Sequence, residues 1–118
     1  MPTQSRFFYK IPYAWNNERN PEQFFDHYQT ITLWFIQQCE KYNNVQFFGL
    51  DLLDYADDLN NYLDARHYLP DLNILQLESI QKQQNILNAK NAENYFKILK
   101  EKIQNYDIQP YIQQIKEK

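Results

Sequence analysis

The chain of 118 residues contains a single glycine, Gly49, and this scarcity restricts the folds open to it. Tight hairpins, bulged strands and phosphate-binding loops draw on glycine, because it enters left-handed backbone conformations without steric cost. Helices need glycine least, because it destabilises their interior. The sequence therefore predicts a mainly α fold: a single helical domain over residues 1–118, built as a compact bundle of four to five helices.

The first expected helix covers residues 20–42. Asn20 suits the N-cap, Pro21 the first helical position, and Gln23 completes a capping box. One apolar stripe then recurs at helical spacing: Phe24, Tyr28, Ile31, Phe35, Cys39 and Tyr42. Three further apolar residues widen it: Leu33, Trp34 and Ile36. A helix that is apolar nearly all round is either central in the fold or meets a partner with its extra face.

A second helix is expected over residues 52–66, with Asp51 as its cap and Pro70 beyond its end. At helical spacing its apolar residues share one side: Leu52, Tyr55, Ala56, Leu59, Tyr62 and Leu63. The opposite side collects an acidic row: Asp54, Asp57, Asp58, Asn61 and Asp64. This segregation predicts an amphipathic helix whose acidic row faces solvent.

Three more helices are expected, at residues 73–88, 92–106 and 109–117. The helix at 92–106 would point Tyr95, Phe96, Leu99, Ile103 and Tyr106 inward.

Residues 1–19 form an aromatic-rich arm interrupted by Pro12, and this arm could pair with residues 45–50 in a short two-stranded β ribbon. With ten Tyr, eight Phe and two Trp, we expect an aromatic-rich core.

Catalytic patterns are missing from the sequence. One Cys and two His are too few for a structural zinc site, and Ser5 and Ser79 lack the context of an activated nucleophile. Asp64 and His67 make one D-x-x-H pair, whereas di-iron helical bundles need two such motifs. We therefore interpret His67 as a histidine near the C-terminal end of a helix, where its charge is favourable, and not as an iron ligand. Cys39 is expected to be a buried, inert thiol. We therefore expect no enzyme, no metal site and no cofactor.

Charge is distributed unevenly along the chain. Residues 51–71 hold six Asp and one Arg, a net charge of −5, while residues 72–118 hold seven Lys against five acids, a net charge of +2. Every acid in the first segment is Asp, although Glu is the better helix former. The acidic row is therefore a candidate surface for a basic partner, with a merely solvated helix face as the alternative interpretation.

In general character the chain resembles bacterial immunity proteins, since it is small, acidic, helical, glycine-poor and without readable catalytic residues. The resemblance covers composition and includes no motif. It implies a cytoplasmic protein-binding module that neutralises a toxin or nuclease with a cationic cleft. The partner-binding residues would then be Asp54, Asp57, Asp58, Asn61 and Asp64.

The alternative function is that of a structural or assembly subunit, such as a homodimer, which self-associates through Leu33, Trp34 and Ile36. Aromatic residues of the arm are further interface candidates, because Tyr and Trp are enriched at hot spots: Tyr9, Tyr13 and Trp15. The C-terminal lysines would give only weak nucleic-acid binding. No stretch approaches the ~18 apolar residues of a membrane span, and the N-terminus lacks the apolar core of a secretory signal, so we expect a cytoplasmic location.

Overall fold

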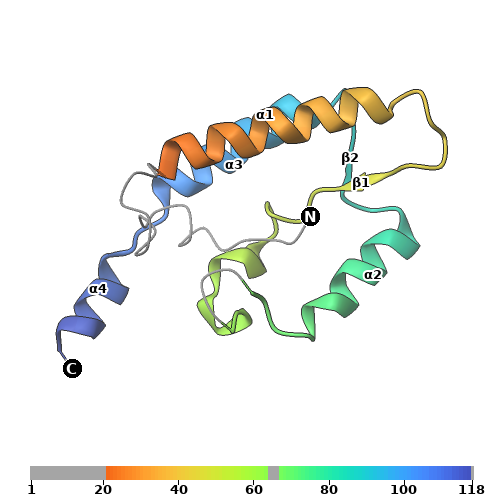
Figure 1. The fold of residues 1–118 in the computed structure, drawn as a ribbon. Coiled ribbons are helices and arrows are strands. Elements are labelled where there is room, and N and C mark those ends of the chain that lie inside the picture. The colour runs from red at the N-terminus through yellow and green to blue at the C-terminus, as the bar shows by residue number, and fades with distance from the viewer. Residues whose placement is uncertain (1–20, 64–66, 118) are drawn as a thin grey trace.

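The computed structural model describes residues 21–63 and 67–117 and is mainly helical, with a short antiparallel sheet (Figure 1). The α-helices are α1 (Pro21–Cys39), α2 (Leu72–Lys82), α3 (Ala92–Asn105) and α4 (Gln109–Lys116). The 3-10 helices are η1 (Asp54–Asp57) and η2 (Leu59–Asn61), and the strands are β1 (Phe47–Phe48) and β2 (Ile86–Leu87). The predicted mainly α class is confirmed.

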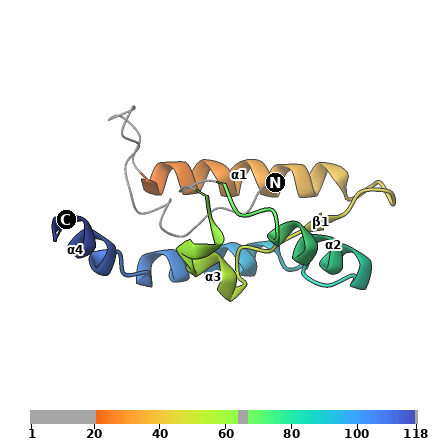
Figure 2. The same cartoon turned by 90° about the horizontal axis from the view of Figure 1, so that it is seen from below.

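Helices α1 and α3 lie side by side along one edge of the fold (Figures 1 and 2). The 3-10 helices and α2 lie on one side of this pair, and α4 extends away from it. Strands β1 and β2 join the two parts, with Phe47 opposite Leu87 and Phe48 opposite Ile86. The α1–α3 pair is therefore the frame on which the remaining segments are placed.

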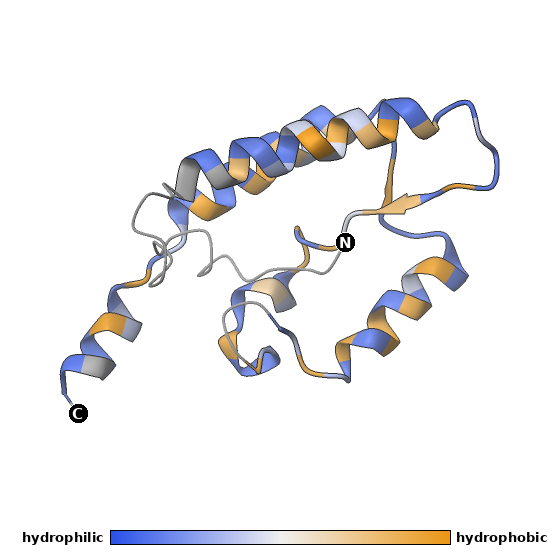
Figure 3. Cartoon of the chain, viewed as in Figure 1, coloured by the Kyte–Doolittle hydropathy of each residue, from blue (hydrophilic) through white to orange (hydrophobic). Residues whose placement is uncertain are grey.

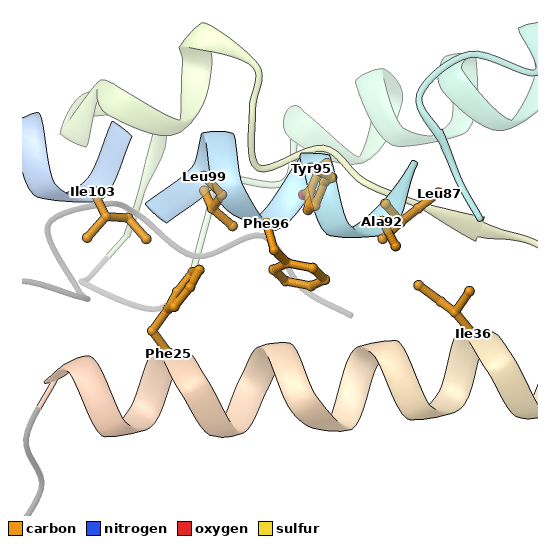
Figure 4. Packing of buried hydrophobic residues seen from close by; sticks show 8 residues of the cluster. All are labelled: Phe25, Ile36, Leu87, Ala92, Tyr95, Phe96, Leu99 and Ile103. Atoms are coloured by element: carbon orange, nitrogen blue, oxygen red, sulfur yellow. The ribbon is translucent and has the colours of Figure 1, made fainter. Parts of the chain in front are cut away.

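The core between α1 and α3 is rich in aromatic rings, as the composition predicted (Figure 4). Phe96 of α3 is 1% exposed and makes edge-to-face contacts with three rings. These belong to Phe25 at 6.2 Å between centroids, Tyr28 at 5.7 Å and Tyr95 at 5.3 Å. Edge-to-face pairs add about 0.5–1.5 kcal/mol each beyond the burial of their area. Leu99 and Ile103 continue the cluster toward the end of α3.

The helix predicted at 20–42 is confirmed as α1, although it ends at Cys39 and Asn20 lies outside the described residues. Its buried face is rotated from the expected stripe and consists of Phe25, Thr32 and Ile36. Ile31 and Phe35 of the predicted stripe are about half exposed, at 51% and 46%. The helix carries apolar residues on most of its surface, so contact with α3 decides which of them are buried.

The helix predicted at 52–66 is wrong. Leu52 and Leu53 lie in a turn, η1 and η2 follow, and an isolated bridge pairs Tyr62 with Tyr68. Short polar side chains take over backbone hydrogen bonds here: Asp58 accepts from the amide of Asn60 at 2.9 Å, and the side-chain amide of Asn61 donates to a backbone carbonyl at 2.9 Å. Such competition is why Asp and Asn favour turns over helix interiors.

The helix predicted at 73–88 is correct only in its first part, because α2 ends at Lys82. Gln83 and Asn85 take left-handed conformations with φ of 54° and 60°, which end the helix and direct the chain into β2. The predicted strand within residues 45–50 exists as β1, but its partner is β2. The arm at 1–19, which we expected as the partner, lies outside the described residues.

The C-terminal predictions are the most accurate ones. The segment 92–106 forms α3, and four of its five predicted inward residues are buried: Tyr95, Phe96, Leu99 and Ile103. The segment 109–117 forms α4, with Pro110 in its first turn. Clean apolar periodicity between clear breaks explains this accuracy.

Candidate functional site

A buried carboxylate connects α1, the segment after β1 and α3. Asp51 is 6% exposed, and its Oδ2 accepts hydrogen bonds from the hydroxyls of Tyr28 at 3.3 Å and Tyr95 at 3.1 Å. The Asp51 backbone amide donates to the Tyr95 hydroxyl oxygen at 3.1 Å. The predicted role of Asp51 as a helix cap is therefore wrong. A buried carboxylate keeps its charge only when polar groups compensate for the lost water, and the two tyrosines supply such groups.

The single glycine allows Tyr95 to reach this position. A Cβ atom at Gly49 would lie 2.6 Å from Cε2 and 2.9 Å from Cζ of the Tyr95 ring, which is closer than real Cβ atoms approach other atoms. The ring therefore packs directly against the backbone of Gly49, two residues before Asp51. A side chain at this position would move the ring, and with it the hydroxyl that binds Asp51.

Burial raises the pKa of Tyr28 and of Tyr95 far above the ordinary value of a tyrosine, and the adjacent charge of Asp51 raises both further. Both hydroxyls consequently stay protonated at neutral pH and remain hydrogen-bond donors. The two tyrosines therefore contribute neutral, oriented hydroxyl dipoles to the cluster.

A cavity of about 230 Å³ opens beside this cluster. Its polar lining includes Asp51 and Thr32, which are both buried, and its aromatic lining includes Tyr28, Phe47 and Tyr95. The cavity lies between α1, β1, the last turns of α2 and the start of α3. It is therefore framed by segments that are far apart in the sequence.

The predicted acidic row does not form one helical face. Asp54 and Asp58 are exposed on the 3-10 turns, Asp57 and Asn61 are half-buried, and Asp64 lies outside the described residues. Among the described residues, the ion pairs of lysines are Lys82 with Glu78 and Lys100 with Asp26, both at 3.9 Å. Neither pair includes an aspartate of η1 or of the turn after it.

The predicted apolar interface of α1 is only partly available. Ile36 is 2% exposed and therefore offers little surface to a partner, and Leu33 is partly buried against the core. Trp34 is 55% exposed and makes an edge-to-face contact with Phe35 at 5.2 Å. The other interface candidates lie in the arm, outside the described residues: Tyr9, Tyr13 and Trp15.

Helix α2 also carries apolar residues among its polar ones (Figure 3). Of these, Ile74, Leu77 and Ile80 are 60%, 64% and 48% exposed. Cys39 is half-buried and forms no disulfide, so the expected full burial of this thiol is wrong.

Residues 21–63 and 67–117 contain no group of three or more metal-ligating side chains. No helix among them is long and apolar enough to span a membrane.

The cluster of Asp51 with two tyrosines was not predicted from the sequence, although a signal for it exists. Asp51 lies in an apolar run, between Leu50 and Leu52, two residues after the single glycine. An acid inside such a run has to be paired when the run is buried. The pairing with Tyr28 and Tyr95 depends on long-range packing, so the sequence alone could not identify these partners.

Comparison with known proteins identifies no relative: no family model matches the chain, and neither a curated protein nor a solved structure is detectably similar to it.

Replacing Gly49 with Ala should lower the free energy of unfolding by about 1–3 kcal/mol, because the new methyl group displaces the Tyr95 ring. Urea denaturation of the wild type and of G49A measures the loss. In a Tyr95→Leu background the same substitution should cost less, since the crowding ring is absent. Equal costs in both backgrounds would contradict the contact.

Stability should fall as the pH rises above about 10, the ordinary pKa of tyrosine. Above this pH the unfolded chain releases protons from Tyr28 and Tyr95, while the folded chain retains them because their pKa is raised. These two groups therefore contribute their full stabilisation of the folded state below this pH, and this contribution decreases as the pH rises above it. Denaturant midpoints measured from pH 8 to 11 should show a shallower alkaline decline in Tyr95→Phe. An unchanged decline would show that Tyr95 ionises equally in both states.

Proposed function

We propose that this chain acts by binding another protein, and that Asp54 and Asp58 contact a basic surface of that partner. The observation that carries the proposal is the exposure of these two carboxylates on the turns around η1. The lysine ion pairs found among the described residues, Lys82 with Glu78 and Lys100 with Asp26, do not include them. Complementary charges raise the rate of encounter and disfavour partners of the wrong charge.

The turns that carry these aspartates are held in place by the rest of the fold. The Tyr62 hydroxyl donates to the carbonyl of Ala56 at 3.3 Å, and the Tyr106 hydroxyl at the end of α3 donates to the carbonyl of Asp57 at 3.3 Å. Ala56 itself is 1% exposed. A surface that is already ordered loses less entropy on binding, which favours a turn segment of this kind as a recognition element.

The most concrete form of the proposal is a toxin-neutralising inhibitor in the cytoplasm, whose partner is an enzyme with a cationic cleft, such as a nuclease. Blocking such a cleft requires carboxylates at suitable positions and no catalytic group of the inhibitor's own. It also requires no cofactor. Occlusion of the cleft by the turns around η1 would then be the mechanism of inhibition.

The test is a double substitution, Asp54→Asn with Asp58→Asn, compared with the charge-matched control Glu93→Gln with Glu101→Gln on α3. A partner captured by the immobilised wild type is titrated against each protein by calorimetry at several salt concentrations. The aspartate variant should bind several-fold more weakly and show a smaller salt dependence, because rim charges act mainly through encounter. The control should bind as the wild type does. Equal affinity and salt dependence of all three proteins would reject the proposal.

A second candidate function is self-association through the outer face of α1, and a different observation favours it. Ile31, Trp34 and Phe35 lie within one turn of this helix and are 51%, 55% and 46% exposed. Aromatic residues that share one exposed face are typical of interface hot spots. In this case α1 would pair with a second copy of the chain or with a neighbour in an assembly.

Sedimentation equilibrium over increasing protein concentration tests this candidate. The mass of the wild type should rise above that of one chain, and Trp34→Glu should remain monomeric because a charge would be buried at the contact. Leu77→Glu on α2 is the matched control and should associate as the wild type does. A wild type that stays monomeric at the highest concentration would exclude self-association.

A further inference from the structure

We propose that a second cavity, at the C-terminal end of α1, binds an uncharged small molecule built on a single aromatic ring. This α1-end pocket has a volume of about 220 Å³. Its lining comes from the last turn of α1, from the loop at 40–46 and from both strands. Neither Asp54 nor Asp58 lines it, so this ligand site is independent of the proposed function.

The floor of the α1-end pocket is apolar. Ile36 and Leu87 line it, are only 2% and 7% exposed, and lie at the same end of the core between α1 and α3 (Figure 4). Phe47, which pairs with Leu87 across the sheet, adds an aromatic ring to the lining. Apolar groups that border a cavity are covered favourably by an apolar ligand, because water is displaced from both surfaces.

The rim of the pocket favours an aromatic ligand. Tyr42 and Val45 line the pocket and are 52% and 40% exposed, so the rim offers apolar surface that a ligand can cover. The rings of Tyr42 and Phe47 can make offset or edge-to-face contacts with a ligand ring. Cys39 contributes a sulfur atom, which also contacts aromatic rings favourably. A saturated ring of the same shape would lack these contacts.

Hydrogen bonds hold two walls of the pocket in place before a ligand arrives. The side-chain amides of Gln46 and Gln83 bond to each other in both directions, at 2.6 Å and 3.2 Å, and attach the loop to the end of α2. Asn88 accepts from the backbone amides of Lys90 and Asn91 at 2.9 Å and 3.1 Å. A pocket whose walls are already ordered loses less entropy on binding.

Size and charge exclude other classes of ligand. A cavity of about 150 Å³ with Leu, Ile and Phe walls holds benzene, so about 220 Å³ accommodates one ring with a short substituent. Drug-sized ligands and nucleotides occupy roughly 300–1,000 Å³. Among the described residues that line the pocket, Glu40 is the only charged one, and its carboxylate disfavours anions. Glu40 is exposed, so solvent screens its attraction for a cation.

The test titrates the full chain with three probes of similar size: benzyl alcohol, cyclohexylmethanol and benzoate. Backbone amide chemical shifts report binding. Benzyl alcohol should give saturable shifts at the amides of Val45, Phe47 and Leu87. Cyclohexylmethanol should bind several-fold more weakly and benzoate at least tenfold more weakly. No saturable shift with benzyl alcohol, or equal affinity for either of the other probes, would overturn the proposal.

A pair of tryptophan substitutions locates the site. Val45→Trp fills the mouth of the pocket from an exposed loop position and should weaken benzyl alcohol binding at least tenfold. Ile31→Trp is the matched control, because Ile31 is 51% exposed on α1 and does not line the pocket. It should bind as the wild type does. Full binding by V45W would overturn the assignment to this pocket.

Cys39 provides a second measurement, which does not depend on the folding of V45W. It is the one cysteine of the chain, so a mixed disulfide with an added thiol forms there. In a thiol–disulfide buffer the folded protein should capture phenylmethanethiol at least fivefold more than 2-mercaptoethanol, as counted by mass spectrometry. In concentrated urea this preference should disappear. An equal preference in the folded and the unfolded protein would contradict a ring-binding pocket beside Cys39.

Discussion

The buried carboxylate of Asp51 is the constraint on which the arrangement of this molecule depends. Its hydrogen bonds to Tyr28 and Tyr95 join α1 and α3 to the segment that leaves β1. Leaving a charge buried without such partners costs several kcal/mol, on the order of 3–5 in comparable cases. These hydrogen bonds place the chain after β1 against the α1–α3 pair. They thereby fix the positions of the cavity beside Asp51 and of the turns around η1.

Much of the fold follows from local sequence. Helix α1 begins at Pro21 and α3 buries four of its five predicted residues, because both carry strong helical periodicity with clear boundaries. The mainly α class follows from the lack of glycine. The turns at 54–61 could not be predicted by periodicity, since their apolar residues follow a helical pattern while Asp58 and Asn61 hydrogen-bond to nearby backbone and favour turns.

The candidate site was harder to predict than the fold. Its members are separated by 23 and 44 residues in the chain, so no local pattern connects Asp51 to Tyr28 or Tyr95. The sequence does indicate where the site lies. A lone glycine indicates a close contact with the backbone, and an acid within an apolar run indicates a buried carboxylate that needs a polar partner. The buried face of α1 also differs from the predicted stripe: its apolar surface extends nearly all round, and the packing of α3 selects Phe25 and Ile36 as buried residues.

The most direct test of this account uses the one glycine as a unique reporter. Labelling glycine with ¹³C gives a single α-carbon resonance, because the chain contains only Gly49. The account predicts nuclear Overhauser effects between the α-protons of Gly49 and the ring protons of a tyrosine, and their loss in Tyr95→Leu. A folded protein whose glycine protons show no contact with any tyrosine ring would contradict the placement of Tyr95 against the backbone, and with it the pairing that holds Asp51.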